Sequence, residues 1–305
     1  MREIDLTARI GGLVLPNPVM LASGTCAYGV EMEPYGKISG LGAVVVKGLS
    51  LEPSRGNPPP RIVETPSGML NAIGLENIGV QAFLLEKLPL LRERGARVIA
   101  NIYGETLEEY RRLAEVLDDA EGLCAMEVNI SCPNVRKGGM LFGQDARETR
   151  RLVAAVRKVT DKPLLVKLSP NVTDIGDIAR AAADGGGDAL TLINTLQGMA
   201  VDVECRRPSL ANVVGGLSGP AIRPVAVRAI WQARQAVDLP LVGVGGIATA
   251  RDALEFIIAG ASAVQLGTVN FVHPGRWQEV LEGIADYLRR HGISRLSRLV
   301  GSLEY

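Results

Sequence analysis

The sequence predicts a single (β/α)8 barrel that occupies the whole chain, residues 1–305. Short aliphatic runs recur eight times, loops rich in glycine or asparagine follow them, and amphipathic stretches of helical periodicity lie between them. The runs lack strict alternation of apolar and polar residues, which is typical of parallel strands buried on both faces. A doubly wound open sheet is the alternative. It is less favoured because no G-x-G-x-x-G motif follows the first run.

The chain begins with a turn-rich piece. Residues 6–15 place Gly11-Gly12 between two short apolar segments, which predicts a β-hairpin that covers one end of the core. The barrel strands are then expected at residues 19–22, 43–47, 98–102, 125–129, 164–168, 189–193, 241–244 and 263–266.

Helices are expected between these strands. The periodicity predicts them at residues 105–118, 144–160, 172–184, 220–236 and 249–259, with Thr106 as the N-cap of the first. Three connections, 48–77, 130–144 and 194–219, are longer than a barrel requires. All three follow predicted strands, so we expect them as long insertions at the C-terminal face, where barrel active sites lie.

The composition excludes several classes of protein. Lys plus Arg and Asp plus Glu both number 33, so the balanced charge argues against a nucleic-acid or membrane-surface binder. No apolar run reaches the length of a membrane helix and no signal peptide is visible, so we expect a cytoplasmic protein. The four cysteines form no C-x-x-C pair and there are two histidines, so we expect no metal site in this chain.

Polar residues stand at the ends of several of the apolar runs. In chain order they are Ser23, Lys47, Asn101, Asn129, Lys167 and Asn194. Because the C-terminal ends of barrel strands meet at one mouth, we expect these side chains to converge. Lys47 and Lys167 follow core-forming runs, which makes a snorkelling surface lysine the poorer explanation. Two lysines and several carboxamides predict a site for an anionic, planar ligand rich in carbonyl groups.

Glycine turns after the last two strands predict a phosphate site. Gly245-Gly246 follow the seventh strand and Gly267-Thr268 the eighth, while Gly219 precedes another helix. Backbone N–H groups at these positions, with a helix N-terminus nearby, are the usual phosphate cradle of a barrel. Tight turns that serve only the fold are the alternative explanation.

A thiol lies at the end of the fourth strand, in Asn129-Ile130-Ser131-Cys132-Pro133-Asn134. Pro133 ends the strand because it cannot donate a ladder hydrogen bond. Two carboxamides flank the thiol and a glycine-rich loop follows it, which favours a functional cysteine over a buried structural one. Together with the phosphate cradle and the lysines, this arrangement indicates a flavin mononucleotide (FMN) enzyme in which Cys132 takes a proton from the substrate.

The segment 129–134, together with Asn71-Ala72-Ile73-Gly74-Leu75, Lys47-Gly48 and Gly245-Gly246, resembles the catalytic set of the dihydroorotate dehydrogenases. The resemblance runs essentially end to end. It implies an FMN-containing (β/α)8 barrel, with one FMN per chain, that oxidises (S)-dihydroorotate to orotate in pyrimidine synthesis. Cys132 is similar to the catalytic base of class 1 members. Class 2 members have serine there and a membrane-associating N-terminal extension, so we expect no coupling to quinone.

The resemblance also implies the contacts of each ligand. The implied substrate contacts are Lys47, Asn71, Ala72, Ile73, Gly74, Leu75, Asn129, Asn134, Asn194 and Thr195. The implied FMN contacts are Ser23, Lys47, Gly48, Asn101, Asn129, Lys167, Ile193, Gly219, Gly245, Gly246, Gly267 and Thr268.

Within class 1, residues 55–61, 71–77 and 137–143 resemble the 1B subgroup. That resemblance implies a partner subunit that carries FAD and a [2Fe–2S] cluster and passes electrons to NAD, with two copies of each chain. The 1A homodimer that uses fumarate is the nearest alternative. Three further functions stay open: a dihydropyrimidine dehydrogenase acting on uracil or thymine, an aldolase-type barrel with Lys167 as a Schiff-base lysine, and a flavin-storage barrel.

Overall fold

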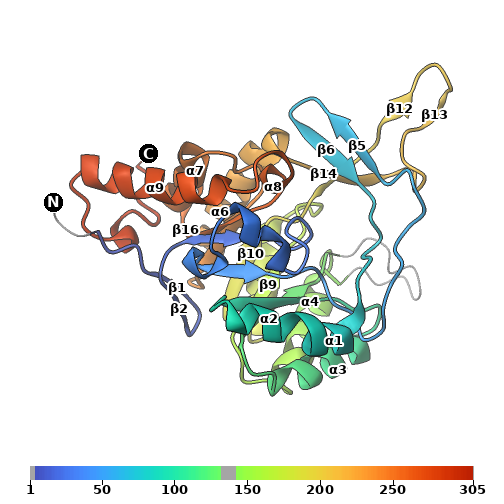
Figure 1. Ribbon diagram of the computed structural model, residues 1–305, viewed down its shortest axis with the longest axis horizontal. Coiled ribbons are helices and arrows are strands. Elements are labelled where there is room, and N and C mark those ends of the chain that lie inside the picture. The colour runs from blue at the N-terminus through green and yellow to red at the C-terminus, as the bar shows by residue number, and fades with distance from the viewer. Residues whose placement is uncertain (1–3, 132–141, 305) are drawn as a thin grey trace.

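The eight predicted strands form a closed barrel in the computed structural model, which describes residues 4–131 and 142–304. Each strand pairs in parallel with the next in the chain, and the last pairs with the first. The barrel strands are β3 (Val19–Leu21), β4 (Ala43–Val45), β7 (Val98–Ile102), β8 (Leu123–Asn129), β9 (Leu164–Lys167), β10 (Ala189–Leu192), β15 (Leu241–Val244) and β16 (Ala261–Leu266). Figure 1 shows the helices around this barrel, and the predicted fold class is confirmed.

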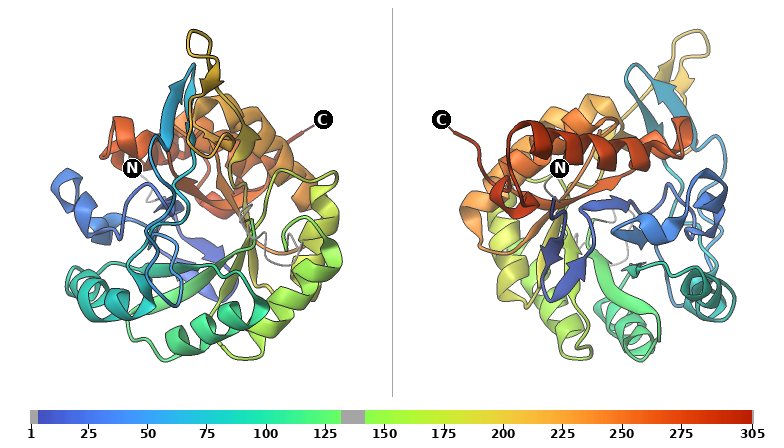
Figure 2. Two further views of the ribbon diagram at one scale, coloured as in Figure 1. Left: turned by 90° about the vertical axis from the view of Figure 1, so that its right-hand side faces the viewer. Right: turned by 60° about the vertical axis from the view of Figure 1, so that its left-hand side comes forward.

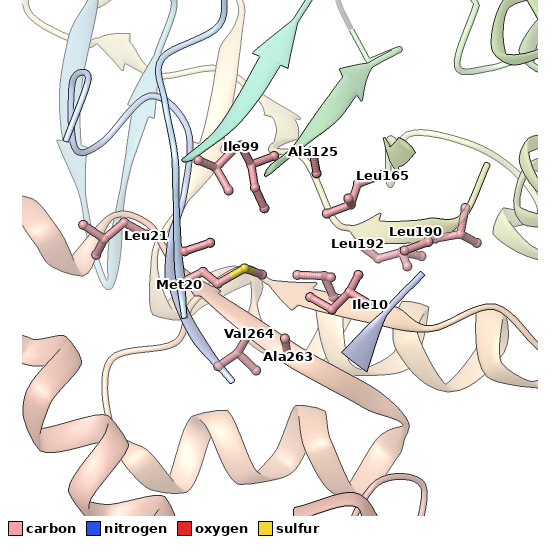
Figure 3. Close-up of a cluster of buried hydrophobic side chains, with 14 of the residues drawn as sticks. Ile10, Met20, Leu21, Ile99, Ala125, Leu165, Leu190, Leu192, Ala263 and Val264 are labelled. Carbon is pink, nitrogen blue, oxygen red and sulfur yellow. The ribbon is translucent and has the colours of Figure 1, made fainter. Parts of the chain in front are cut away.

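The predicted N-terminal hairpin is also present, as β1 (Ala8–Ile10) and β2 (Leu13–Leu15). Ile10 is fully buried, and Figure 3 shows it among side chains of the barrel strands, including Met20 and Leu190. Gly11 allows the close approach: its φ is +47°, and a Cβ there would lie 2.5 Å from the Cβ of Asp188. Asp188 directly precedes β10, so the hairpin lies at the N-terminal end of the barrel.

Amphipathic helices cover the outside of the barrel (Figure 2). They are α1 (Gly79–Ala82), α2 (Leu88–Glu93), α3 (Leu107–Asp118), α4 (Ala146–Arg157), α5 (Ile175–Asp184), α6 (Arg223–Ala236), α7 (Ala250–Ala259), α8 (Val269–Val272) and α9 (Arg276–Arg290). Thr106 forms the predicted N-cap of α3 in a capping box with Glu109. The sequence pattern did not predict α1 and α2, where a π-helical turn, Phe83–Lys87, joins the two helices and Pro89 falls in the first turn of α2.

Two of the long insertions are more ordered than the sequence predicts. Residues 48–77 contain β5 (Ile62–Thr65) and β6 (Gly68–Asn71), and residues 194–219 contain β11 (Leu196–Gly198) and β14 (Gly215–Ser218). These strands form one antiparallel sheet in the order β11-β14-β6-β5. A small hairpin, β12 (Val201–Asp202) with β13 (Arg207–Pro208), extends beyond it (Figure 1).

This second sheet escaped prediction because its strands are short and include glycine and polar side chains. It is held by pairing between distant segments, such as Asn71 with Gly216, where the Asn71 amide also donates to the Gly216 carbonyl at 3.3 Å. Because both insertions follow barrel strands, the sheet stands over the C-terminal end of the barrel. Across the described residues, no helix is both long enough and apolar enough to cross a membrane.

Candidate active site

A cavity of about 1050 Å³ opens at the C-terminal end of the barrel, between the strand ends and the second sheet. Every predicted site residue within residues 4–131 and 142–304 lines it. These residues are Ser23, Lys47, Gly48, Asn71, Ala72, Ile73, Gly74, Leu75, Asn101, Asn129, Lys167, Ile193, Asn194, Thr195, Gly219, Gly245, Gly246, Gly267 and Thr268. Cys132 and Asn134 lie outside the described residues, as do residues 137–141.

A buried carboxylate that was not among the predicted site residues lies beneath the floor of the cavity, in contact with the lining residues Asn101 and Lys167. Glu127 lies in β8, is fully buried, and accepts hydrogen bonds from Asn101 Nδ2 at 2.8 Å and Gln265 Nε2 at 2.8 Å. Its second oxygen also accepts from the Thr191 hydroxyl at 2.9 Å. The signal in the sequence is an acidic residue inside an otherwise apolar parallel strand, which requires buried partners.

Lys167 completes this floor from the neighbouring strand β9. Its ammonium lies 3.8 Å from Glu127 Oε1, and its side chain is 8% exposed, so the ion pair is almost entirely buried. Strand register aligns Lys167 with Asn129 on one side and with Thr191 on the other. The cation is therefore presented at the cavity floor by the barrel itself, not by a mobile surface side chain.

Asn101 presents a hydrogen-bond acceptor at the same floor. Its Nδ2 is engaged by Glu127, while its Oδ1 is buried and has no hydrogen-bond partner in the part of the chain that the structure describes. A buried unpaired carbonyl costs free energy, so this atom is suited to accept a hydrogen bond from a ligand N–H. The floor thus offers a cation and an acceptor side by side.

The segment that leads into Cys132 is anchored to the barrel. Ser131 donates from its backbone N–H to Asn129 Oδ1 at 3.2 Å and from its hydroxyl to the Lys167 carbonyl at 3.1 Å. The Asn194 amide donates to the same Asn129 oxygen at 3.2 Å. These contacts fix both asparagines at the strand ends, where both residues line the cavity.

The mouth of the cavity carries a second lysine in a more open setting. Lys47 is partly buried near an ion pair between Arg61 and Glu76, whose side chains are 29% and 44% exposed. Burial lowers the pKa of Lys47 below its usual value of 10.5, Glu76 raises it in part, and Arg61 lowers it further. Arg61 and Glu76 both line the cavity, and neither was predicted as a site residue.

The segment 71–75 lies between the mouth and the second sheet in a constrained conformation. Gly74 has φ +73° and a Cβ there would lie 2.6 Å from the Asn57 backbone nitrogen, so only glycine fits. Leu75 also has positive φ, and its carbonyl accepts hydrogen bonds from the Tyr103 hydroxyl and the Asn77 amide, both at 2.9 Å. The loop is therefore held rigidly against the cavity.

Glycine turns also line the cavity, at the positions where the sequence predicts a phosphate cradle. Gly219, Gly245 and Gly246 all have positive φ, and a Cβ on Gly246 would lie 2.7 Å from the Gly219 carbonyl oxygen. The first turn of α7 does not line the cavity; Thr249 and Asp252 cap it within the helix. The glycine turns, and not the N-terminus of α7, therefore line the cavity here.

Cys26 lies just behind the cavity wall and belongs to the core. Its thiol donates to the carbonyls of Ala22 at 3.4 Å and Val45 at 3.5 Å, and burial raises the pKa of the thiol to about 12. A thiol held protonated and buried in this way is a poor base and a poor nucleophile. Cys26 is therefore a structural cysteine that supports the site from behind.

Comparisons with known proteins agree with this geometry. The family model described as dihydroorotate dehydrogenase matches residues 5–288. A relative from Geotalea daltonii is 56% identical over 100% of both chains. A relative from Pelobacter propionicus is also 56% identical, over 98% of this chain and 99% of its own. A relative from Solidesulfovibrio magneticus is 56% identical over 99% of each chain. All three are named the catalytic subunit of dihydroorotate dehydrogenase B (NAD+).

Proposed function

The chain belongs to the dihydroorotate dehydrogenase family, and from this premise we propose that it is the catalytic subunit of an NAD-linked enzyme of pyrimidine biosynthesis. Its reaction is the flavin-dependent oxidation of (S)-dihydroorotate to orotate. The observation that carries the proposal is the cavity in which buried Lys167, the unpaired Asn101 oxygen and the glycine turns meet. Identity of 56% with NAD-linked catalytic subunits along the whole chain supports it.

We propose that the flavin is FMN, with one per chain. Gly219, Gly245 and Gly246 line the cavity in turns of positive φ where a Cβ would crowd neighbouring protein atoms, and backbone N–H groups in such glycine turns are suited to bind a phosphate. Lys167 and Asn101 match a ring edge that has both carbonyl oxygens and an N–H group. Bound FMN supplies the hydride acceptor of the reaction.

The substrate lies between the flavin and the segment 71–75 in this proposal. The Lys47 ammonium neutralises an anionic group of dihydroorotate, and the carboxamides of Asn129 and Asn194 donate to its ring carbonyls. Asn134 and Thr195 complete the predicted contact set. The rigid loop 71–75, held by Tyr103 and Asn77, fixes the orientation of the substrate and excludes water from one face of the substrate ring.

Cys132 is the proposed base. It removes the proton from the carbon beside the ring carbonyl, while the neighbouring carbon loses hydride, so that a C=C bond forms. The position follows Ser131 along the chain, and the contacts of Ser131 to Asn129 and to Lys167 support an exit from β8 at the cavity. The thiolate form of Cys132 accepts this proton directly and becomes the thiol.

The catalytic subunit works with a partner subunit. We propose that the partner carries FAD and a [2Fe–2S] cluster, that two copies of each chain assemble, and that the assembly is cytoplasmic. In this arrangement electrons leave the cavity for the partner and reach NAD. If the acceptor were instead fumarate in a stand-alone homodimer, the isolated chain would be active with fumarate and would need no partner subunit.

The test combines Cys132 variants with the natural acceptor. Cys132→Ala should keep its flavin and lose most turnover, and Cys132→Ser should gain activity as pH rises, because a hydroxyl is the weaker acid. Cys205→Ala, which removes an exposed thiol, is the matched control and should be unchanged. Normal turnover of Cys132→Ala at neutral pH would reject the base.

The acceptor and substrate are tested with the wild-type protein. Co-purification with an iron–sulfur flavoprotein and reduction of NAD by dihydroorotate are the expected results. Activity of the isolated chain with fumarate would instead place it with the homodimeric enzymes. Faster flavin reduction by dihydrouracil than by dihydroorotate would contradict the assigned substrate.

A further inference from the structure

Glu127 is the one fully buried carboxylate among the described residues, and every partner that it has there is a hydrogen-bond donor. The donors are Asn101 Nδ2, Thr191 Oγ1, Gln265 Nε2 and the Lys167 ammonium. On the side of Asn101 and Lys167, a protonated carboxyl or an amide nitrogen would point its own donor at another donor, whereas the Thr191 hydroxyl on the other side can also accept. The set of four donors is therefore complementary to the two oxygens of a carboxylate.

The four donors come from four different barrel strands, β7, β9, β10 and β16. Glu127 itself belongs to β8, so the contacts of its two oxygens connect five of the eight barrel strands just below the cavity. Oε1 takes the two groups that line the cavity, Asn101 and Lys167, whereas Oε2 takes Thr191 and Gln265, which do not line it. The two oxygens thus divide the network into a cavity side and a core side.

The cavity side fixes the polarity of the floor. Because Asn101 donates its Nδ2 to Glu127, its Oδ1 must be the atom that remains for a ligand. Because the Lys167 ammonium lies 3.8 Å from the same oxygen, its charge is held in place and partly offset. Both groups that we assign to the flavin therefore depend on one carboxylate.

We propose that Glu127 is a positioning residue that aims Asn101 and Lys167 at the bound flavin and sets how much positive charge the flavin experiences. The inference rests on the proposed function, because it takes the occupant of the cavity to be FMN. The reduced flavin is anionic at neutral pH, so a nearby carboxylate disfavours it and lowers the reduction potential. Glu127 thereby keeps reduced flavin ready to pass its electrons on.

The test is the reduction potential of the bound flavin in the full chain carrying Glu127→Gln. Removing the negative charge should favour the reduced form about tenfold, which is a rise of about 30 mV for a two-electron couple. Thr191→Val is the matched control: it removes one hydrogen bond on the core side, keeps the charge, and should leave the potential unchanged. A potential that does not rise in Glu127→Gln would overturn the inference and leave Glu127 a purely structural residue.

A second variant covers the case in which Glu127→Gln does not fold. Glu127→Asp keeps the charge but is one methylene shorter, so its carboxylate lies further from Lys167. The reduction potential of the flavin should therefore rise, by less than the about 30 mV expected for Glu127→Gln. An unchanged potential in a folded, flavin-loaded Glu127→Asp would also contradict the inference. If the wild-type protein binds no flavin, the proposed function itself is wrong. If dihydroorotate reduces the flavin of the wild type but the variants have the wild-type reduction potential, only the role of Glu127 is wrong.

Discussion

Lys47 and Lys167 have the same place in the sequence pattern, since each follows a run of aliphatic residues that forms a barrel strand, yet the structure gives them different surroundings. Lys167 lies at the cavity floor against a fully buried carboxylate. Lys47 lies nearer the mouth, partly buried, beside the half-exposed ion pair of Arg61 and Glu76. The first cation is part of the core and the second belongs to the solvent-facing side of the site.

The two lysines therefore differ in which part of their surroundings governs the charge of the side chain. Inside the barrel, Glu127 offsets the Lys167 charge in a medium that screens little, so the two groups depend on each other. At the mouth, water weakens the influence of Arg61 and Glu76, and burial is the main cause that lowers the pKa of Lys47. Variants of these residues test the contrast, from the largest expected effect to the smallest.

Lys167→Met should be the most destabilising of the lysine variants. It leaves the Glu127 carboxyl group buried without its cation, and breaking a buried pair on one side costs about 3–5 kcal/mol. The three neutral donors to Glu127 remain, so we expect about 3 kcal/mol, measured by denaturant unfolding at fixed flavin concentration. Lys47→Met is the control and should cost less than about 1 kcal/mol. Equal losses for both variants would remove the contrast between core and mouth.

Lys47→Ala should act on catalysis more than on stability. Loss of a charged hydrogen bond to the substrate costs about 1.5–3 kcal/mol, so kcat/KM for dihydroorotate should fall by roughly ten- to a hundredfold in flavin-saturated protein. Steady-state kinetics check the fall, and the unfolding midpoint should stay close to that of the wild type. A normal kcat/KM would show that Lys47 does not bind the substrate.

Alkaline pH should weaken substrate binding through Lys47. Burial lowers the pKa of Lys47 below its usual value of 10.5, so the ammonium group loses its proton at a lower pH than an exposed lysine does. Because the ammonium binds an anionic substrate, KM should rise with pH and begin to rise below pH 10.5. Lys47→Arg keeps its charge at all these pH values and should not show the rise. A KM that stays flat in the wild type would contradict the assignment.

Variants of the mouth ion pair should shift that alkaline rise in opposite directions. Glu76→Gln removes the group that raises the pKa of Lys47, so the rise should move to lower pH. Arg61→Gln removes a neighbour that lowers the pKa of Lys47, so the rise should move to higher pH. The pair is partly exposed, and each change should alter the free energy of unfolding by less than about 1 kcal/mol. Shifts in the same direction would show that Lys47 does not sense these charges.

Much of the barrel could be predicted from the sequence because its strands are buried on both faces and therefore read as apolar runs. The same logic located Asn101, Asn129 and Lys167, since a polar residue at the end of such a run must face the cavity or find buried partners. The second sheet could not be predicted. Its strands pair across insertions that are far apart in the chain, and neither β6 nor β14 has an apolar pattern of its own.

The sequence by itself determined the barrel, the glycine turns and the polar strand ends, because each depends on local patterning that a single stretch of chain carries. The roles of Cys132 and Asn134 rest on that sequence and on family membership, since these residues lie outside the described structure. Only the tertiary structure decided the surroundings of each site residue. Glu127 received four donors, and Lys47 received Arg61 and Glu76 as neighbours, because barrel closure and loop pairing bring distant strands together.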